Sequence, residues 1–179
     1  SLSPRLTLQL VIDHAPTHRE KNDATDHWQK GDIAMVQKNL ARLYPLIKNA
    51  PHRARVEVLF TDKAAMRQLK KKFFGRAASA NVLSFPSGDA TSPFHPKKNT
   101  LFLGSIALSY QTIKNEARKQ QKEFHDHLLH LALHGLLHLL GHDHQQTRQA
   151  TTMEALEIQL LNTIAIANPY DSNSNQYKK

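Results

Sequence analysis

The chain has 179 residues, 40% of them hydrophobic, and contains no cysteine. This length suits one domain with a sizeable core, and the lack of cysteine excludes disulfides, thiolate nucleophiles and cysteine-ligated zinc. Lysine and arginine total 24 against 15 aspartates and glutamates, a formal net charge of +9 that fits either a solvated basic surface or a polyanionic partner such as RNA, DNA or anionic lipid. Because cysteine is absent and no run of 18 apolar residues occurs, we expect a cytoplasmic protein without a membrane partner.

The hydrophobic pattern predicts a mixed series of strands and helices. In chain order we expect a strand at 6–12, a helix at 32–48, a strand at 56–60, a helix at 62–73, strands at 81–85 and 101–107, and helices at 109–119, 123–140 and 148–165. Asp32 and either Thr61 or Asp62 are the expected N-caps of the first two helices.

No repeat and no long linker divides the chain, so we predict a single domain over residues 1–179. Residues 13–30 are polar and are expected to form a loop, and residues 168–179 are expected to be a frayed tail. The mixed order of strands and helices predicts a fold of the α+β or α/β class.

The segment HGLLHLLGHDH, residues 134–144, places four histidines within eleven residues of an otherwise apolar helix. Side chains four apart on a helix differ by about 40° around its axis, so His134 and His138 share a face and can bind one ion. Gly141 tolerates a positive φ and permits a turn that brings His144 to the same ion. Three histidines with an open coordination position are typical of a catalytic zinc site, and we predict one Zn²⁺ per chain on these three residues.

Other residues of the segment compete for this role. His142 lies inside the turn, and a residue beyond a turn reaches back more readily, so we prefer His144. His130 continues the i, i+4 series, but three ligands four apart on a straight helix cannot converge on a tetrahedral ion. Asp143 either orients a ligand or simply solvates the turn.

The same histidine and glycine spacing occurs in metzincin proteases, where a glutamate after the first histidine is the general base. Here that position is Gly135, which has no group that can take a proton from water. The sequence therefore argues against peptide hydrolysis.

With Gly135 in place, the segment resembles the signature of the YbeY-type endoribonucleases, a family of single-strand-specific, metal-dependent ribosomal RNA maturation factors. NVLSFP at 81–86, LGSIALS at 103–109 and MEALE at 153–157 match the family's order. The resemblance implies an α+β domain with a mixed four-stranded sheet packed by about five helices. It also implies a metal-dependent hydrolase that cleaves single-stranded RNA, with ribosomal RNA and the small ribosomal subunit as partners in ribosome biogenesis.

Three positions depart from the family's pattern. The family usually carries an arginine, thought to contact RNA, seven residues before the NVLSFP strand, where this chain has Phe74. Ala80 stands in place of a threonine and Ser105 in place of an aspartate. These residues are not the predicted metal ligands, but they bear on RNA binding, and Arg76 is the nearby residue that could replace the missing arginine.

The helix at 62–73 carries Lys70, Lys71 and Lys72, and Arg76 follows it. We predict these four residues as phosphate contacts, and the alternative is a solvated basic helix face. Two other functions remain open, a non-catalytic ribosome-associated factor that keeps the metal site and, disfavoured by Gly135, a zinc metalloprotease. The sequence assigns no catalytic residue beyond the metal ligands.

Overall fold

The sheet is built from four strands. The structure, a computed structural model, describes residues 3–13, 27–88, 100–142 and 146–171, and within these ranges the strand order is β1-β2-β4-β3. The strands are β1 (Arg5–Ile12), β2 (Arg53–Thr61), β3 (Val82–Pro86) and β4 (Leu101–Ser109). Strands β1, β2 and β4 run parallel, whereas β3 pairs antiparallel with β4 and forms an edge. The predicted mixed four-stranded sheet is confirmed.

The central strand β2 shows why these segments form strands. Its alternate residues Ala54, Val56, Val58 and Phe60 are buried, as the period of two requires for a strand with one face on the core. Its register with β4 shifts between Arg55 and Val56, next to Gly104. Gly104 has φ 130°, and a Cβ there would lie 2.2 Å from the carbonyl oxygen of Phe85, so only glycine fits this irregularity.

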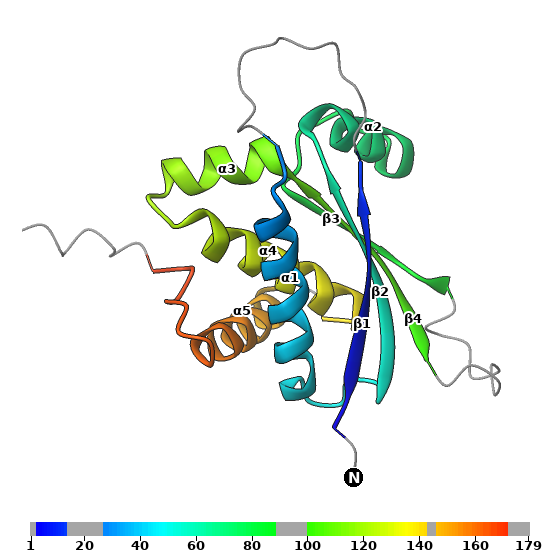
Figure 1. Cartoon of the computed structure of the whole chain (residues 1–179), viewed down its shortest axis with the longest axis vertical. Helices are drawn as coiled ribbons and strands as arrows, with labels where there is room; N and C mark the ends of the chain where they lie inside the picture. Colours follow the sequence, from blue (N-terminus) through cyan, green and yellow to red (C-terminus); the bar gives the residue numbers. More distant parts are fainter. Residues whose placement is uncertain (1–2, 14–26, 89–99, 143–145, 172–179) are drawn as a thin grey trace, which may run out of the picture.

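Five α-helices accompany the sheet within the described residues. They are α1 (Lys30–Leu43), α2 (Lys63–Phe74), α3 (Tyr110–Lys119), α4 (Phe124–Leu139) and α5 (Thr147–Asn162). A short 3₁₀ turn, Tyr44–Leu46, follows α1. In Figure 1, α1, α3, α4 and α5 gather on one side of the sheet, whereas α2 lies beyond the end at which β2 finishes. The fold is therefore of the α+β class, with helices concentrated on one face.

Helix α4 is central to this arrangement. It contacts β3, β4, α1, α3 and α5, and most of its leucines are fully buried. A helix that is apolar on nearly all sides is expected to be enclosed in this way. Each buried polar side chain on it must therefore find a partner inside the protein.

The predicted elements are confirmed with small shifts of their ends. Asp62 is the N-cap of α2, and its carboxylate accepts a hydrogen bond from the Ala65 amide at 2.8 Å. The prediction for Asp32 was wrong, because the N-cap of α1 is Gln29 and Asp32 lies three residues further on, accepting the Gln29 amide at 2.8 Å. This reciprocal pair is a capping box, which a reading of single cap residues overlooks.

The two segments predicted to be polar and irregular are described only in part. Residues 14–26 of the expected loop and residues 172–179 of the expected tail lie outside the described residues. Residues 168–171 are joined to the domain, because the Lys122 ammonium donates to the Pro169 carbonyl and the Tyr170 hydroxyl donates to Glu157. Among the described residues, no helix combines the length and the apolar character needed to cross a bilayer.

Candidate metal centre

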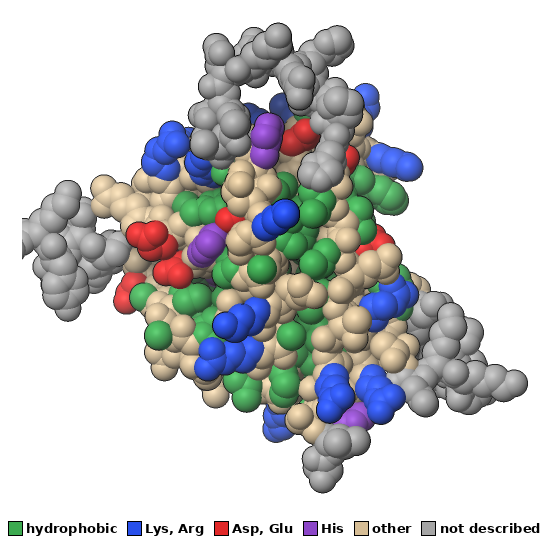
Figure 2. Space-filling model, in the orientation of Figure 1, with side chains coloured by type: hydrophobic (Ala, Val, Ile, Leu, Met, Phe, Trp, Pro, Cys, Tyr) green, Lys and Arg blue, Asp and Glu red, His purple; other side chains and the backbone are tan. Residues whose placement is uncertain are grey.

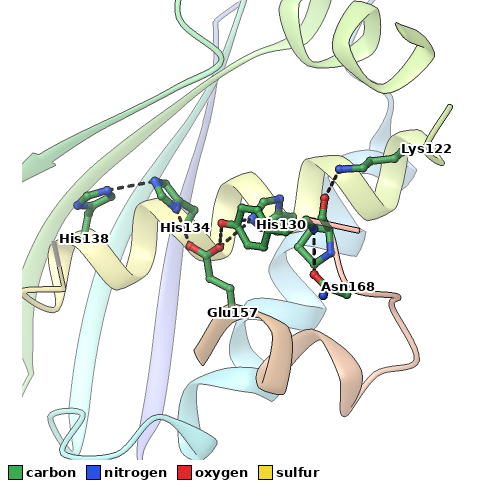
Figure 3. A network of polar contacts seen from close by, with 8 residues as sticks. Lys122, His130, His134, His138, Glu157 and Asn168 are labelled. Carbon is green, nitrogen blue, oxygen red and sulfur yellow. Dashed lines mark hydrogen bonds and ion pairs between the residues drawn. The ribbon is translucent and has the colours of Figure 1, made fainter. Parts of the chain in front are cut away.

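His134 and His138 project from the same face of α4, as their spacing predicts. Their Nε2 atoms lie 3.1 Å apart, and their rings are nearly perpendicular, with an interplanar angle of 78°. Figure 3 shows both imidazoles on one side of the helix, with the two Nε2 atoms facing each other. The helix thus brings two of the three predicted ligands together.

The separation of these nitrogens suits a shared zinc ion. Two nitrogens bound at 2.0–2.1 Å to a tetrahedral ion are about 3.3 Å apart. The observed 3.1 Å is close to that value and is also compatible with a direct hydrogen bond between the rings. A shared zinc ion requires both Nε2 atoms to lack a proton, whereas a hydrogen bond between the rings requires only one of them to lack it. The partner of each Nδ1 atom therefore matters, because it decides which nitrogen carries the proton.

Glu157 supplies that partner to His134. Its carboxylate comes from α5, has no solvent exposure, and accepts a hydrogen bond from His134 Nδ1 at 2.5 Å. A proton held on Nδ1 leaves the Nε2 lone pair of His134 available to a metal. Carboxylate–histidine pairs of this kind orient the ligands of many zinc sites.

The same carboxylate joins two further groups. His130 Nε2 lies 2.8 Å from the Glu157 carboxylate, and the Tyr170 hydroxyl also donates to it. Burial alone would raise the pKa of Glu157, but the hydrogen bonds from His130, His134 and Tyr170 outweigh it and lower the pKa to about 2. In the same contact, burial and the carboxylate raise the pKa of the Tyr170 hydroxyl. Glu157 is therefore an ionised acceptor for three donors.

The other histidines of α4 also face carboxylates, which accounts for their presence on a buried helix. His125 Nε2 lies 2.7 Å from Asp32, and His127 Nε2 lies 2.8 Å from Glu116. In His130 the Nε2 atom faces Glu157. In His134 the Nδ1 atom faces the same carboxylate, so its Nε2 atom points toward His138 instead.

The turn after α4 has the predicted form. Gly141 has φ 93°, its amide donates to the His138 carbonyl, and the His142 amide donates to the Leu137 carbonyl, both at 3.0 Å. These two bonds make a Schellman motif, for which glycine is the usual residue. The chain beyond it contains Asp143 and His144, which lie outside the described residues. The described residues alone place no three suitable side chains around one point, so the third ligand stays a prediction.

Gly135 has a packing role that the sequence did not reveal. A Cβ at this position would lie 3.0 Å from Ile106 Cγ2 and 3.2 Å from Ser84 Oγ, so the helix approaches the sheet closely here. The Ser84 hydroxyl also donates to the Gly135 carbonyl at 3.1 Å. A glutamate at 135 would point into β3 and β4, which strengthens the argument against the metzincin arrangement.

The predicted phosphate contacts lie at the end of α2. Lys71, Lys72 and Arg76 are exposed, and Lys70 is half-buried. Figure 2 shows lysine and arginine side chains spread over one face of the molecule, without a single dominant patch. On the face that Figure 2 shows, charge alone does not mark out an RNA-binding surface.

The structure does not place this basic segment on the same side of β3 as His134 and His138. Val82 and Ser84 face Gly135 of α4, so Phe85, the next residue of the strand, points to the opposite side. The ring of Phe85 contacts Phe74 at the end of α2, with ring centroids 5.9 Å apart. The last turn of α2 and the histidine pair are thus separated by one edge strand.

Sequence reasoning overlooked Glu157 although its pattern carried a signal. On α5, Glu157 shares a buried stripe with Met153, Leu160 and Leu161, at positions i, i+4, i+7 and i+8. A carboxylate within such a stripe requires a buried partner. Ser105, one of the three positions that depart from the expected pattern, donates a hydrogen bond to Glu57 at 3.2 Å.

Comparison with known proteins finds relatives over most of the chain. The sequence profile of the family described as Endoribonuclease YbeY matches residues 18–165. An Endoribonuclease YbeY of Chelativorans sp. is 44% identical over 149 residues, covering 82% of this chain and 89% of the relative. Another, of Bradyrhizobium sp. (strain BTAi1), is 41% identical over 168 residues, covering 94% of both chains.

A solved structure shares the fold. The solution structure of TM1509 from Thermotoga maritima aligns with a TM-score of 0.54 and 18% sequence identity, covering 97% of this chain and all of the other. Together with the profile match over most of the chain, these likenesses show that the chain belongs to the YbeY endoribonuclease family.

Proposed function

We propose that this protein is a metal-dependent endoribonuclease that hydrolyses single-stranded RNA. One observation carries the proposal, the pair of histidine Nε2 atoms 3.1 Å apart, with the Nδ1 of His134 held by a buried, ionised carboxylate. The relatives named Endoribonuclease YbeY that are 44% and 41% identical support an RNA substrate.

The proposed ligands of one Zn²⁺ are His134, His138 and, from the sequence pattern, His144. A zinc ion held there would act as a Lewis acid toward a phosphoryl oxygen and would lower the pKa of a water molecule beside it. Glu157 keeps the proton of His134 on Nδ1 and fixes the ring's orientation. Gly135 leaves no carboxylate beside the first histidine, so a general base of the protease kind is missing at that position.

The basic end of α2 is the proposed binding site for the RNA phosphates. Lys70, Lys71, Lys72 and Arg76 would neutralise phosphates, each contact releasing counterions. The proposal also includes ribosomal RNA as the substrate, the small ribosomal subunit as the partner and the cytoplasm as the location. These three rest on the family resemblance.

A cleavage assay separates this function from its alternatives. We would incubate a defined single-stranded RNA, its double-stranded counterpart and an unstructured protein with the purified protein, each with and without a chelator. The proposal expects internal cleavage of the single strand alone, abolished by the chelator. Binding of RNA without cleavage would support the non-catalytic alternative, and chelator-sensitive digestion of the protein would support a protease.

A further inference from the structure

Two adjacent phenylalanines at the end of α2 are exposed to solvent. Phe73 is 56% exposed and Phe74 is 51% exposed. Their rings contact the ring of Phe85 on β3, with centroid separations of 5.0 Å and 5.9 Å. We call Phe73, Phe74 and Phe85 the aromatic platform. Aromatic side chains of this size are usually buried, so two exposed ones fixed side by side suggest a binding surface.

The surroundings of the aromatic platform are strongly cationic. Residues 63–88 contain six lysines and arginines and neither aspartate nor glutamate. Lys72 Nζ lies 5.4 Å from the centroid of the Phe73 ring, and Lys71 and Arg76 are exposed nearby in the chain. An apolar protein partner would make few favourable contacts with these surrounding cations. A polyanion that carries flat apolar groups is complementary to both the rings and the cations.

A short series of neighbouring residues and contacts connects the aromatic platform to the histidine pair. Phe85 directly follows Ser84, whose hydroxyl donates to the carbonyl of Gly135 at 3.1 Å, and Gly135 follows His134. Since neighbouring residues of a strand point to opposite sides, the platform and the histidines lie on the two sides of the edge strand β3. A strand of RNA that passes over this edge would meet both.

We propose that the aromatic platform stacks unpaired bases of the RNA substrate, while the neighbouring cations hold the adjoining phosphates. This inference rests on the proposed function and adds a base-binding subsite to it. Stacking on aromatic rings within a cationic groove is the common mode of binding single strands, and it favours single strands because paired bases do not present their faces.

The test uses binding and its salt dependence together. We would measure the Kd of a single-stranded oligoribonucleotide and of an abasic strand of equal length, checking on a gel that the RNA stays intact. Phe74→Ala should weaken binding of the base-bearing strand by about 5- to 150-fold, the range for one stacked base. Phe74→Leu should also weaken it, whereas Phe74→Trp should keep or improve it, because only an aromatic ring stacks.

Two controls separate stacking from general surface effects. The slope of log Kd against log salt should not change in the Phe74 variants, because a phenyl ring releases no counterions. The abasic strand should bind the parent and Phe74→Ala equally. Leu46, which is 55% exposed and lies in another part of the fold, provides the matched variant Leu46→Ala, and its binding should equal that of the parent.

The outcomes distinguish the inference from the proposed function. If the parent cleaves single-stranded RNA but the Phe74 variants bind both strands as the parent does, the platform does not stack bases and the proposed function stands. If Phe74→Leu binds as tightly as the parent, the contact is merely apolar and the inference is wrong. If the parent neither binds nor cleaves RNA, both proposals fail.

Discussion

Replacing Glu157 by glutamine should weaken metal binding while keeping the size of the side chain. Glu157 accepts hydrogen bonds from His134, His130 and Tyr170 and has no solvent exposure. A glutamine retains one acceptor oxygen and turns an amide group, which is a donor, toward the other partners. His134 then loses the acceptor that keeps its proton on Nδ1, or another buried donor loses its partner.

The magnitude follows from these contacts. Loss of a group that orients a metal-binding histidine costs about 10- to 100-fold in metal affinity. This corresponds to about 1.4–2.8 kcal/mol at 25 °C. The metal-free protein should also lose about 1–3 kcal/mol of unfolding free energy, because a buried donor is left unpaired.

Competition with a chromogenic chelator would give the Zn²⁺ affinity, and urea unfolding of the metal-free protein would give the stability. Glu154→Gln, an exposed change on the same helix, is the control and should leave both unchanged. If Glu157→Gln lowers stability but binds Zn²⁺ with the affinity of the parent, Glu157 is a structural residue and its orienting role is refuted.

Three further variants test other parts of the account. Gly135→Ala should lower the unfolding free energy in urea titrations, because the added Cβ meets Ile106 Cγ2 at 3.0 Å. This overpacking costs about 1–3 kcal/mol and outweighs the gain of about 1 kcal/mol that alanine has over glycine within a helix; unchanged stability would mean that the neighbouring side chains move aside. Burial lowers the pKa of His127 more than the Glu116 hydrogen bond raises it, so the unfolded chain takes up a proton first as the pH falls below about 6.5, and stability falls with it. His127→Gln should therefore show a shallower loss of stability below this pH, and an identical pH profile would contradict the assignment. Replacing the three lysines at 70–72 by alanine should reduce the salt slope of RNA binding by up to about two units without changing metal content, and an unchanged slope would make them a solvated face.

The parts of the fold that depend on local pattern could be predicted from the sequence. Strand alternation and helix periodicity are properties of consecutive residues, and they located the elements of the sheet and the helices around it. The pairing of His134 with His138 is equally local, because a spacing of four residues fixes their common face on α4. The Gly141 turn follows from a single residue that tolerates a positive φ.

Contacts between distant segments could not be read in this way. Glu157 meets His134 across 23 residues because α5 packs on α4, and hydrophobic periodicity does not specify which buried side chains will touch. Gly135 was interpreted through chemistry, as a missing base, whereas the structure adds a close approach to β3 and β4. The position of α2 on the far side of β3 likewise depends on tertiary packing, so the sequence listed its cations without showing how they lie relative to the histidines.

Whether the metal centre includes His144 would be decided by comparing the rate of single-stranded RNA cleavage by His144→Ala with that by His142→Ala. Both histidines follow α4, but only His144 has the predicted role of third ligand, so His142→Ala is the matched control. We expect His144→Ala to lose its bound metal and its cleavage activity together, and His142→Ala to keep both. Full cleavage by His144→Ala, or its loss in His142→Ala instead, would contradict the proposed metal centre.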